Sequence, residues 1–423
     1  MSMTLSRSKP LPADEFDFRD VVREGDTVTW PQAIGEPLAL TQRLVAQVAE
    51  LPKLSLFFGM SSSRTLSAEL AKYFTLFALN GAGSNRRLSG LTDIVPAAVS
   101  TIPALLRSRR IPVDVTLIRV RPLPDGRYTT GTVSDFSKAM VEAARCVLAE
   151  IDHRLPITGQ DAVIPAEAIH HFVLAGPDEV LMPDPEPSLT ETAVAARVAA
   201  FIPDGATVQL GVGTLPVAVA RALRDHRELG VHSGVISDAY VDLVERGAIT
   251  NARKGIDAGL TVNGGLFGTK RLLDHADGNP TIAMRSSDHT HSVHIMAQLL
   301  NFYSINSALE IDLTGQVNSE EAGGRYLGAV GGQLDFVRGA QLSPGGRSIL
   351  ALPSTTPDCK VSRITSRLGG PVTTPRSDID VVITEHGVAD LRGASFSERT
   401  RRLIAIAHPD FRDDLRAASR REG

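Results

Sequence analysis

The order of apolar and polar positions along the chain predicts strands that alternate with helices. Short apolar runs typical of buried strands occur at residues 26–30, 54–59, 113–120, 206–210, 260–263, 348–353 and 380–384. Apolar positions at helical spacing predict helices that open at Pro37 and cover residues 135–150, 190–201 and 400–407. Strands that alternate with helices form largely parallel sheets covered on both faces, so the pattern predicts an α/β fold.

A proline-dense segment interrupts this pattern near the middle of the chain. It reads Gly176-Pro-Asp-Glu-Val-Leu-Met-Pro-Asp-Pro-Glu-Pro187, a composition that extends the backbone and resists helix formation. The strand, glycine loop and helix pattern then begins again, with the loop at Gly211-Val-Gly-Thr214. The segment therefore predicts a linker between an N-terminal domain, residues 1–180, and a C-terminal domain, residues 190–423.

Composition narrows the class of protein. The chain has 423 residues, 43% of them hydrophobic and 22% charged, as in globular enzymes with two domains. Its formal net charge of −4 argues against nucleic acid as a partner. Cys146 and Cys359 lack the spacing of metal ligands, and residues 1–10 lack the apolar core of a signal peptide. Without an apolar run of membrane-spanning length, we expect a cytoplasmic protein that does not engage a membrane.

The chain is organised around the stretch from Gly230 to Gly247. Its pattern predicts the end of a buried strand, a tight loop and a helix with apolar residues at helical spacing, and Gly247 suits the position after the helix. In an open α/β sheet, ligands and reacting groups gather in loops at the carboxyl ends of strands. This loop is therefore the first place to look for chemistry.

Several runs resemble the acetyl-CoA hydrolase/transferase family of CoA-transferases, the relatives of 4-hydroxybutyrate CoA-transferase. They are Gln209-Leu-Gly-Val-Gly213, Ile249-Thr-Asn-Ala-Arg-Lys254, Ser304-Ile-Asn-Ser-Ala-Leu-Glu-Ile-Asp-Leu-Thr-Gly-Gln316, Gly331-Gly-Gln-Leu-Asp-Phe336, Thr384-Glu-His-Gly-Val-Ala-Asp-Leu-Arg-Gly393 and Ile404-Ala-Ile-Ala-His-Pro-Asp-Phe411. The resemblance implies two open, largely parallel α/β domains with the active site in the cleft between them. It also implies an acyl-CoA substrate, a possible carboxylic acid acceptor, a homodimer, and no cofactor beyond the CoA of the substrate.

The resemblance also identifies a missing group. The family reads roughly Gly-Ile-His-Thr-Glu-Met where this chain reads Gly230-Val-His-Ser-Gly-Val235, so Gly234 stands at the place of the catalytic glutamate. In the family that carboxylate attacks the thioester and forms an acyl-glutamyl anhydride and then a glutamyl-CoA thioester. A glycine cannot do this, and it leaves room for water.

Other binding positions follow from the matched runs, each with a structural alternative. Gly331 and Gly332 match the loop whose backbone N–H groups face the oxyanion, although a tight turn explains them equally well. Gln333 continues that run and is expected beside CoA. Gly211 and Gly213 precede a helix N-terminus, which suits a phosphate or a thioester oxygen or is a plain crossover. Asn306 is expected to contact the CoA arm or to bond only neighbouring backbone.

Several further side chains are weighed as candidates for the chemistry itself. Glu36, at the start of the N-terminal domain's first helix, is the carboxylate that we expect to activate water, and the helix start favours its ionised form. It is equally well a helix-start carboxylate with no catalytic part. His232 stands beside Ser233, but neighbouring strand-end residues point to opposite faces, which disfavours a nucleophile and base pair. His289 and His291 have the look of metal ligands, but the family carries a similar run without metal, so no metal site is expected.

The sequence thus favours an acyl-CoA hydrolase, acting on the thioester or on a C–C bond with activated water. A CoA-transferase that uses a non-standard nucleophile is one alternative. A catalytically inactive subunit that binds acyl-CoA is another. The binding loops would be present in all three cases, so they do not separate them.

Overall fold

The computed structural model describes residues 9–420, so most of residues 1–10, considered above for a signal peptide, lies outside the described part. The chain divides into two compact units. The first comprises the residues up to Ala97, Thr101–Met182 and Gly264–Asp288, and the second comprises Ala98–Ser100, Pro183–Asn263 and the residues from His289 onward. Residues 264–288 therefore pack with the first unit although they follow a large part of the second along the chain.

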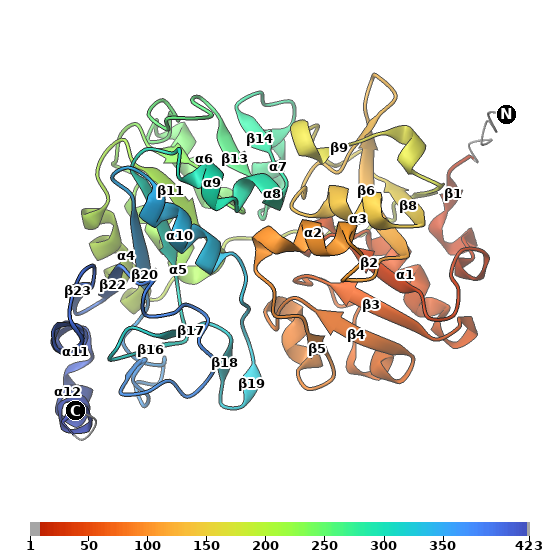
Figure 1. Ribbon diagram of the computed structural model, residues 1–423. Helices are drawn as coiled ribbons and strands as arrows, with labels where there is room; N and C mark the ends of the chain where they lie inside the picture. Colours follow the sequence, from red (N-terminus) through yellow and green to blue (C-terminus); the bar gives the residue numbers. More distant parts are fainter. Residues whose placement is uncertain (1–8, 421–423) are drawn as a thin grey trace. The chain divides into compact units, whose positions relative to one another are not determined.

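The first unit is built on a sheet of parallel strands (Figure 1). Its order is β1 (Leu11–Pro12), β10 (His171–Leu174), β8 (Cys146–Ile151), β6 (Val115–Pro122), β2 (Thr27–Trp30), β3 (Leu54–Phe58), β4 (Phe74–Ala78) and β5 (Asp93–Ile94). All neighbours in this order are parallel, and β7 (Tyr128–Thr129) and β9 (Val163–Ile164) add antiparallel pairs beside β6. The helices are α1 (Leu38–Ala46), α2 (Ile102–Arg107), α3 (Ser137–Ala143) and α7 (Lys270–Ala276), and β14 (Ile282–Met284) also belongs here.

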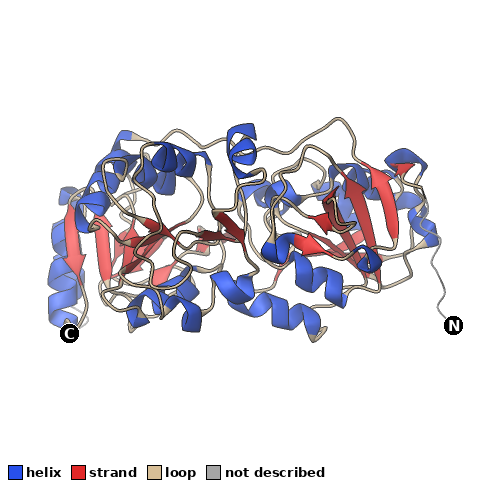
Figure 2. Ribbon diagram, turned by 90° about the horizontal axis from the view of Figure 1, so that it is seen from above, coloured by secondary structure: helices blue, strands red, loops and turns tan. Residues whose placement is uncertain are grey.

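Strand β3 shows why this sheet is covered on both faces. Leu56 and Phe58 pack in one apolar cluster with Leu40 of α1, whereas the intervening Phe57 packs in another with Ile102 of α2. Successive side chains of a strand point to opposite faces, so apolar residues in succession require cover on both. Figure 2 shows helices on both sides of the strands in each unit.

The second unit repeats this architecture. Its sheet has the order β12 (Gly230–Val231), β11 (Thr207–Leu210), β15 (Phe302–Asn306), β20 (Arg347–Ala351), β22 (Val381–Thr384) and β23 (Gly387–Asp390). Only the last pair is antiparallel. The helices are α4 (Leu189–Phe201), α5 (Thr214–Ala222), α6 (Asp238–Glu245), α9 (Val293–Met296), α10 (Gln333–Leu342), α11 (Phe396–Ile406) and α12 (Arg412–Ser419), while α8 (Ser287–Thr290) spans the boundary at residue 288. Helices α9 and α10 and strand β15 share one apolar cluster.

Short strands complete the second unit. One small sheet has the order β17 (Val317–Asn318), β16 (Glu310–Asp312) and β21 (Ile364–Thr365). Strands β18 (Glu321–Ala322) and β19 (Arg325–Tyr326) pair with each other. Strand β13 (Thr261–Asn263) follows helix α6 along the chain. The prediction of open, largely parallel α/β sheets is confirmed. None of the helices within residues 9–420 is both long and apolar enough to cross a membrane.

One predicted helix is wrong in half of its length. Residues 135–150 form α3, which ends at Ala143, and then β8 from Cys146. The run from Cys146 to Glu150 is buried throughout, in a strand flanked by β6 and β10. A continuous apolar run satisfies a helical stripe and a strand buried on both faces equally well, and the neighbouring strands decide between them.

Candidate active site

The loop after β12 lies at the carboxyl end of its strand, as predicted. Backbone bonds hold it between two other strand ends, because His232 N–H donates to the Val208 carbonyl at 3.2 Å and Ser233 N–H donates to the Val262 carbonyl at 2.9 Å. Helix α6 then begins at Asp238, and Gly247 has a φ of +74° after the helix, where glycine is favoured. The loop is therefore rigidly supported up to Gly234, which is half-buried.

His232 and Ser233 do not bond each other. His232 is fully buried, and its Nε2 bonds the Thr290 carbonyl at 3.0 Å. The Ser233 Oγ donates to the Leu210 carbonyl at 2.8 Å. Burial, followed by the charge of nearby Lys254, lowers the pKa of His232 well below its usual range, so the ring is neutral and Nε2–H donates to Thr290. This geometry gives no nucleophile and base pair.

The place of Gly234 is set by the imidazole of His291. A Cβ added at residue 234 would lie 2.9 Å from Cε1 and 3.1 Å from Nε2 of His291. The next heavy atom, Cζ of Phe336, would lie at 3.7 Å. Separations near 3 Å are closer than carbon atoms approach in packed interiors, so any side chain here must displace the ring. Glycine at 234 and the position of His291 therefore depend on each other.

The second glycine loop faces the same ring. Gly331 has a φ of +60°, and Gly332 precedes the first residue of α10. A Cβ at residue 332 would overlap both Cδ2 and Nε2 of His291. Gly234 and Gly332, far apart in sequence, thus both lie against the Nε2 end of one imidazole, and Phe336 of α10 packs on this ring at 4.5 Å between ring centroids.

The two side-chain amides predicted to contact CoA differ in how many hydrogen bonds they already make within the protein. Gln333 is buried, with Oε1 accepting from Ser319 Oγ at 2.9 Å and Nε2 donating to Thr374 Oγ1 at 3.1 Å, so its amide has a structural task. Asn306, at the end of β15 and half-buried, donates to the Gln209 side chain at 3.3 Å. Of the two amides, Asn306 is the more available to a ligand.

The loop from Gly211 to Gly213 leads into α5 as predicted. Gly213 has a φ of +113° and open space around its Cα. The carboxylate of Glu191, from the capping box of α4, bonds the Thr214 hydroxyl in the first turn of α5. An acidic group at this helix start weakens its attraction for a phosphate, although the loop itself remains open.

Glu36 lies in the first unit, between Gly35 and the start of α1. Its side chain is 1% exposed and accepts hydrogen bonds from Thr41 Oγ1 at 3.0 Å and Ser63 Oγ at 2.9 Å, with Ser61 Oγ at 3.5 Å. Burial raises the pKa of Glu36 despite these hydroxyls. The expectation that the helix start favours the ionised form is therefore outweighed by desolvation, and the group becomes a stronger base when it is ionised.

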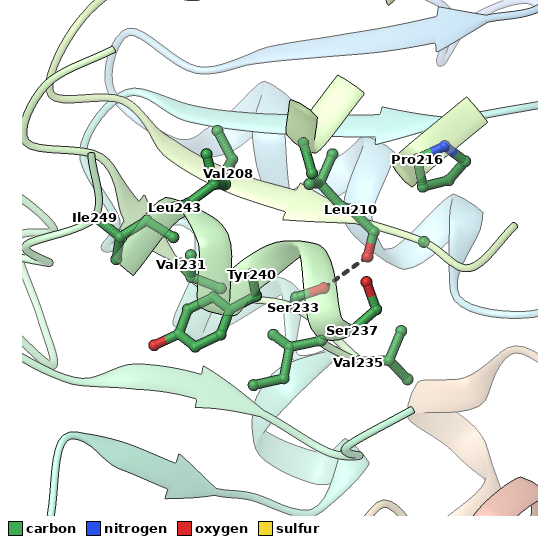
Figure 3. A pocket seen from close by; sticks show the side chains of 13 residues that line it. Val208, Leu210, Pro216, Val231, Ser233, Val235, Ser237, Tyr240, Leu243 and Ile249 are labelled. Atoms are coloured by element: carbon green, nitrogen blue, oxygen red, sulfur yellow. Dashed lines mark hydrogen bonds between the residues drawn. The ribbon is translucent and has the colours of Figure 1, made fainter. Parts of the chain in front are cut away.

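An apolar cavity of about 40 Å³ lies under the loop, between β11, β12, α5 and α6 (Figure 3). Gly211, Ser233 and Val235 are among the residues that line it, and no lining residue is charged. The Ser233 hydroxyl is taken by Leu210, and the Tyr240 hydroxyl bonds Thr261 Oγ1 at 2.7 Å. The cavity supplies space but no reacting group.

The sequence did not predict the roles of two residues of this site, His291 and Lys254. His291 stood out only as half of a metal-like pair, and the structure separates that pair, since His289 Nε2 lies 3.3 Å from Asp257 Oδ2. Lys254, in the matched run after Gly247, is fully buried and donates to the carbonyls of Val231 and Leu260 at 2.8 and 2.6 Å. It fixes β12 directly below the loop. Neither role has a signature in residue spacing.

Comparison with known proteins identifies the family to which the chain is similar. Residues 13–182 match the model of the acetyl-CoA hydrolase/transferase N-terminal domain, and residues 268–419 match that of the C-terminal domain. The chain is 38% identical to a 4-hydroxybutyrate coenzyme A transferase from Clostridium kluyveri, over 92% of each protein. It is 32% identical to an acetyl-CoA hydrolase from Yarrowia lipolytica, over 50% of this chain and 40% of that protein. The crystal structure of RipA from Yersinia pestis is similar, with a TM-score of 0.92, 33% identity and coverage of 98% of this chain and 97% of that one.

Proposed function

Because the chain belongs to the acetyl-CoA hydrolase/transferase family of enzymes, we propose that it hydrolyses an acyl-CoA with water instead of passing CoA through a covalent glutamate. One observation carries the proposal. The atoms that would surround a side chain at residue 234 belong to His291 and Phe336, so this position holds neither a carboxylate nor room for one. The resemblance places the family's nucleophile at this residue.

The proposed reaction needs a base, an oxyanion site and a leaving thiolate. Water attacks the thioester carbonyl carbon as the base takes its proton. The carbonyl electron pair moves to oxygen, and it returns as the C–S bond breaks and releases CoA. We assign the oxyanion contact to the backbone N–H groups around Gly331 and Gly332, at the start of α10 and beside the His291 ring.

Glu36 is the base that we propose. Its burial among hydroxyl groups supports this role, because a carboxyl with a raised pKa accepts a proton more readily than an exposed one. The variant Glu36→Gln keeps the shape and the ability to accept from Thr41, and it removes the basic group. It should therefore lower kcat by about 10²-fold or more with an unchanged fold.

The test is turnover of a panel of acyl-CoAs, with and without acetate, followed by release of free thiol. Hydrolysis predicts thiol release at the same rate in both cases. Intact-protein mass spectrometry after mixing with substrate should show no CoA-sized increment. Conversion of the acyl-CoA to acetyl-CoA when acetate is added, detected by chromatography and without release of free thiol, would establish a transferase instead, as would a CoA-sized increment on an acidic side chain.

Transfer with a non-standard nucleophile is the second candidate, because relatives that match over more than nine-tenths of the chain are named CoA-transferases. The acceptor arm of the same assay decides between the two. Binding of acyl-CoA by calorimetry without any turnover would instead indicate an inactive binding subunit.

A further inference from the structure

We propose that His291 is a catalytic residue that donates a hydrogen bond from Nε2–H to the carbonyl oxygen of the bound acyl-CoA. The inference rests on the proposed function and assigns a group to its reacting site. It begins from the position of the ring between the two glycines of the matched loops, Gly234 and Gly332. Nε2 is the ring atom that lies close to the missing Cβ positions of both glycines, so this nitrogen faces both loops.

Neighbouring contacts hold the ring in this orientation. His291 Nδ1 and Thr290 Oγ1 lie 2.8 Å apart, and the Thr290 carbonyl accepts from Nε2–H of the buried His232. Phe336 packs against the ring from α10. Thus His232 acts as a positioning residue for the segment that carries His291.

The free ring nitrogen is the second observation. His291 is 6% exposed, and within residues 9–420 its Nε2 has no hydrogen-bond partner. The ring is largely buried while Nε2 faces two candidate binding loops without a partner among the described residues, so this nitrogen is available to a ligand atom. We take the Thr290 hydroxyl as the donor to Nδ1, which places the proton of the neutral ring on Nε2.

A donor role fits the chemistry of this ring better than a role as base. Burial lowers the pKa of His291 to about 3, which leaves it neutral near pH 7 and weakly basic. A neutral imidazole still donates a hydrogen bond to a developing oxyanion. In the step, the carbonyl electron pair moves to oxygen and strengthens its bond to Nε2–H. It then returns as the C–S bond breaks, so His291 neither gains nor loses a proton.

Two substitutions at His291 separate the possible roles. Glutamine places an amide N–H near the position of Nε2 but cannot act as a base, whereas leucine fills the space without a donor. Loss of one oxyanion donor costs about 10²- to 10³-fold in kcat. We therefore expect this loss in His291→Leu with little change in KM, and kcat within about tenfold of wild type in His291→Gln.

Equal losses in both variants, or normal turnover in His291→Leu, would overturn the proposal. Thermal unfolding and near-ultraviolet circular dichroism check that each variant is folded. If His291→Leu does not fold, Thr290→Val removes the hydroxyl that sets the ring tautomer, and kcat should fall with an unchanged KM; an unchanged kcat would overturn the proposal.

The kcat values of the His291 variants and the wild-type protein are compared for whichever reaction, hydrolysis or transfer, the wild-type protein catalyses. If that reaction is transfer to acetate, hydrolysis is disproved, but the glutamine and leucine variants still test His291 on the same thioester. A wild-type protein without either reaction would disprove both proposals.

Discussion

At the scale of single residues, the most informative feature is that one imidazole occupies the space beside two glycines. Introducing a glutamate by Gly234→Glu alone should produce no CoA adduct, because its Cβ would meet His291 at 2.9 Å. Even Gly234→Ala should lower the free energy of unfolding by about 1–3 kcal/mol, as in other overpacked sites. Urea denaturation measures this loss. The matched control is Gly159→Ala, where a Cβ has no neighbour within 4 Å, and equal stability of the two variants would contradict the tight fit.

At the scale of elements, the start of α1 depends on a carboxyl group from a strand of the same unit. Glu150 of β8 accepts from the N–H groups of Ala39 and Leu40 with one oxygen, at 2.8 and 3.2 Å. Glu150→Ala leaves both donors without this acceptor, so it should cost about 1–3 kcal/mol of unfolding free energy. Glu150→Gln keeps an acceptor oxygen and should remain near wild type when both are measured at pH 5. If the glutamine variant were as unstable as the alanine variant, the hydrogen bonds from Ala39 and Leu40 would not be the source of the lost stability.

At the scale of the whole molecule, buried groups give stability two opposite dependences on pH. Burial raises the pKa of Glu150 from 4.5 to about 7, so the folded state binds more protons than the unfolded state in this range and stability falls as pH rises through it. For His291 the pKa falls from 6.5 to about 3, the unfolded state binds more protons, and stability rises with pH across that window.

The two variants should therefore diverge from wild type in opposite directions. Between pH 5 and pH 8, Glu150→Gln should gain stability relative to wild type by roughly 2–3 kcal/mol, since one pKa unit corresponds to about 1.4 kcal/mol. Between pH 4 and pH 7, His291→Gln should lose stability relative to wild type. Denaturant unfolding at these pH values provides the measurement, and parallel profiles for all three proteins would disprove the assignment.

The spacing of apolar residues along the chain predicted many of the helices and strands, but it could not predict those that depend on capping or on neighbouring strands. Strand β3 and helix α4 follow directly from apolar spacing, because each buries a regular set of side chains. Helix α11 begins at Phe396, earlier than its apolar stripe, because Ser395 and Glu398 form a capping box in a polar stretch. Strand β8 was mistaken for helix because only its neighbours in the sheet distinguish the two.

The sequence by itself determined the family and the α/β architecture, because these depend on ordered motifs and on periodic burial. Gly234 and Gly332 were identifiable as glycines in matched runs, but nothing in their spacing placed His291 against both of them. Only the tertiary structure decided that contact, since it joins three segments separated by some forty or more residues along the chain. Likewise, the place of Glu36 before a helix predicted a lowered pKa and an ionised group, whereas burial in the folded protein raises its pKa.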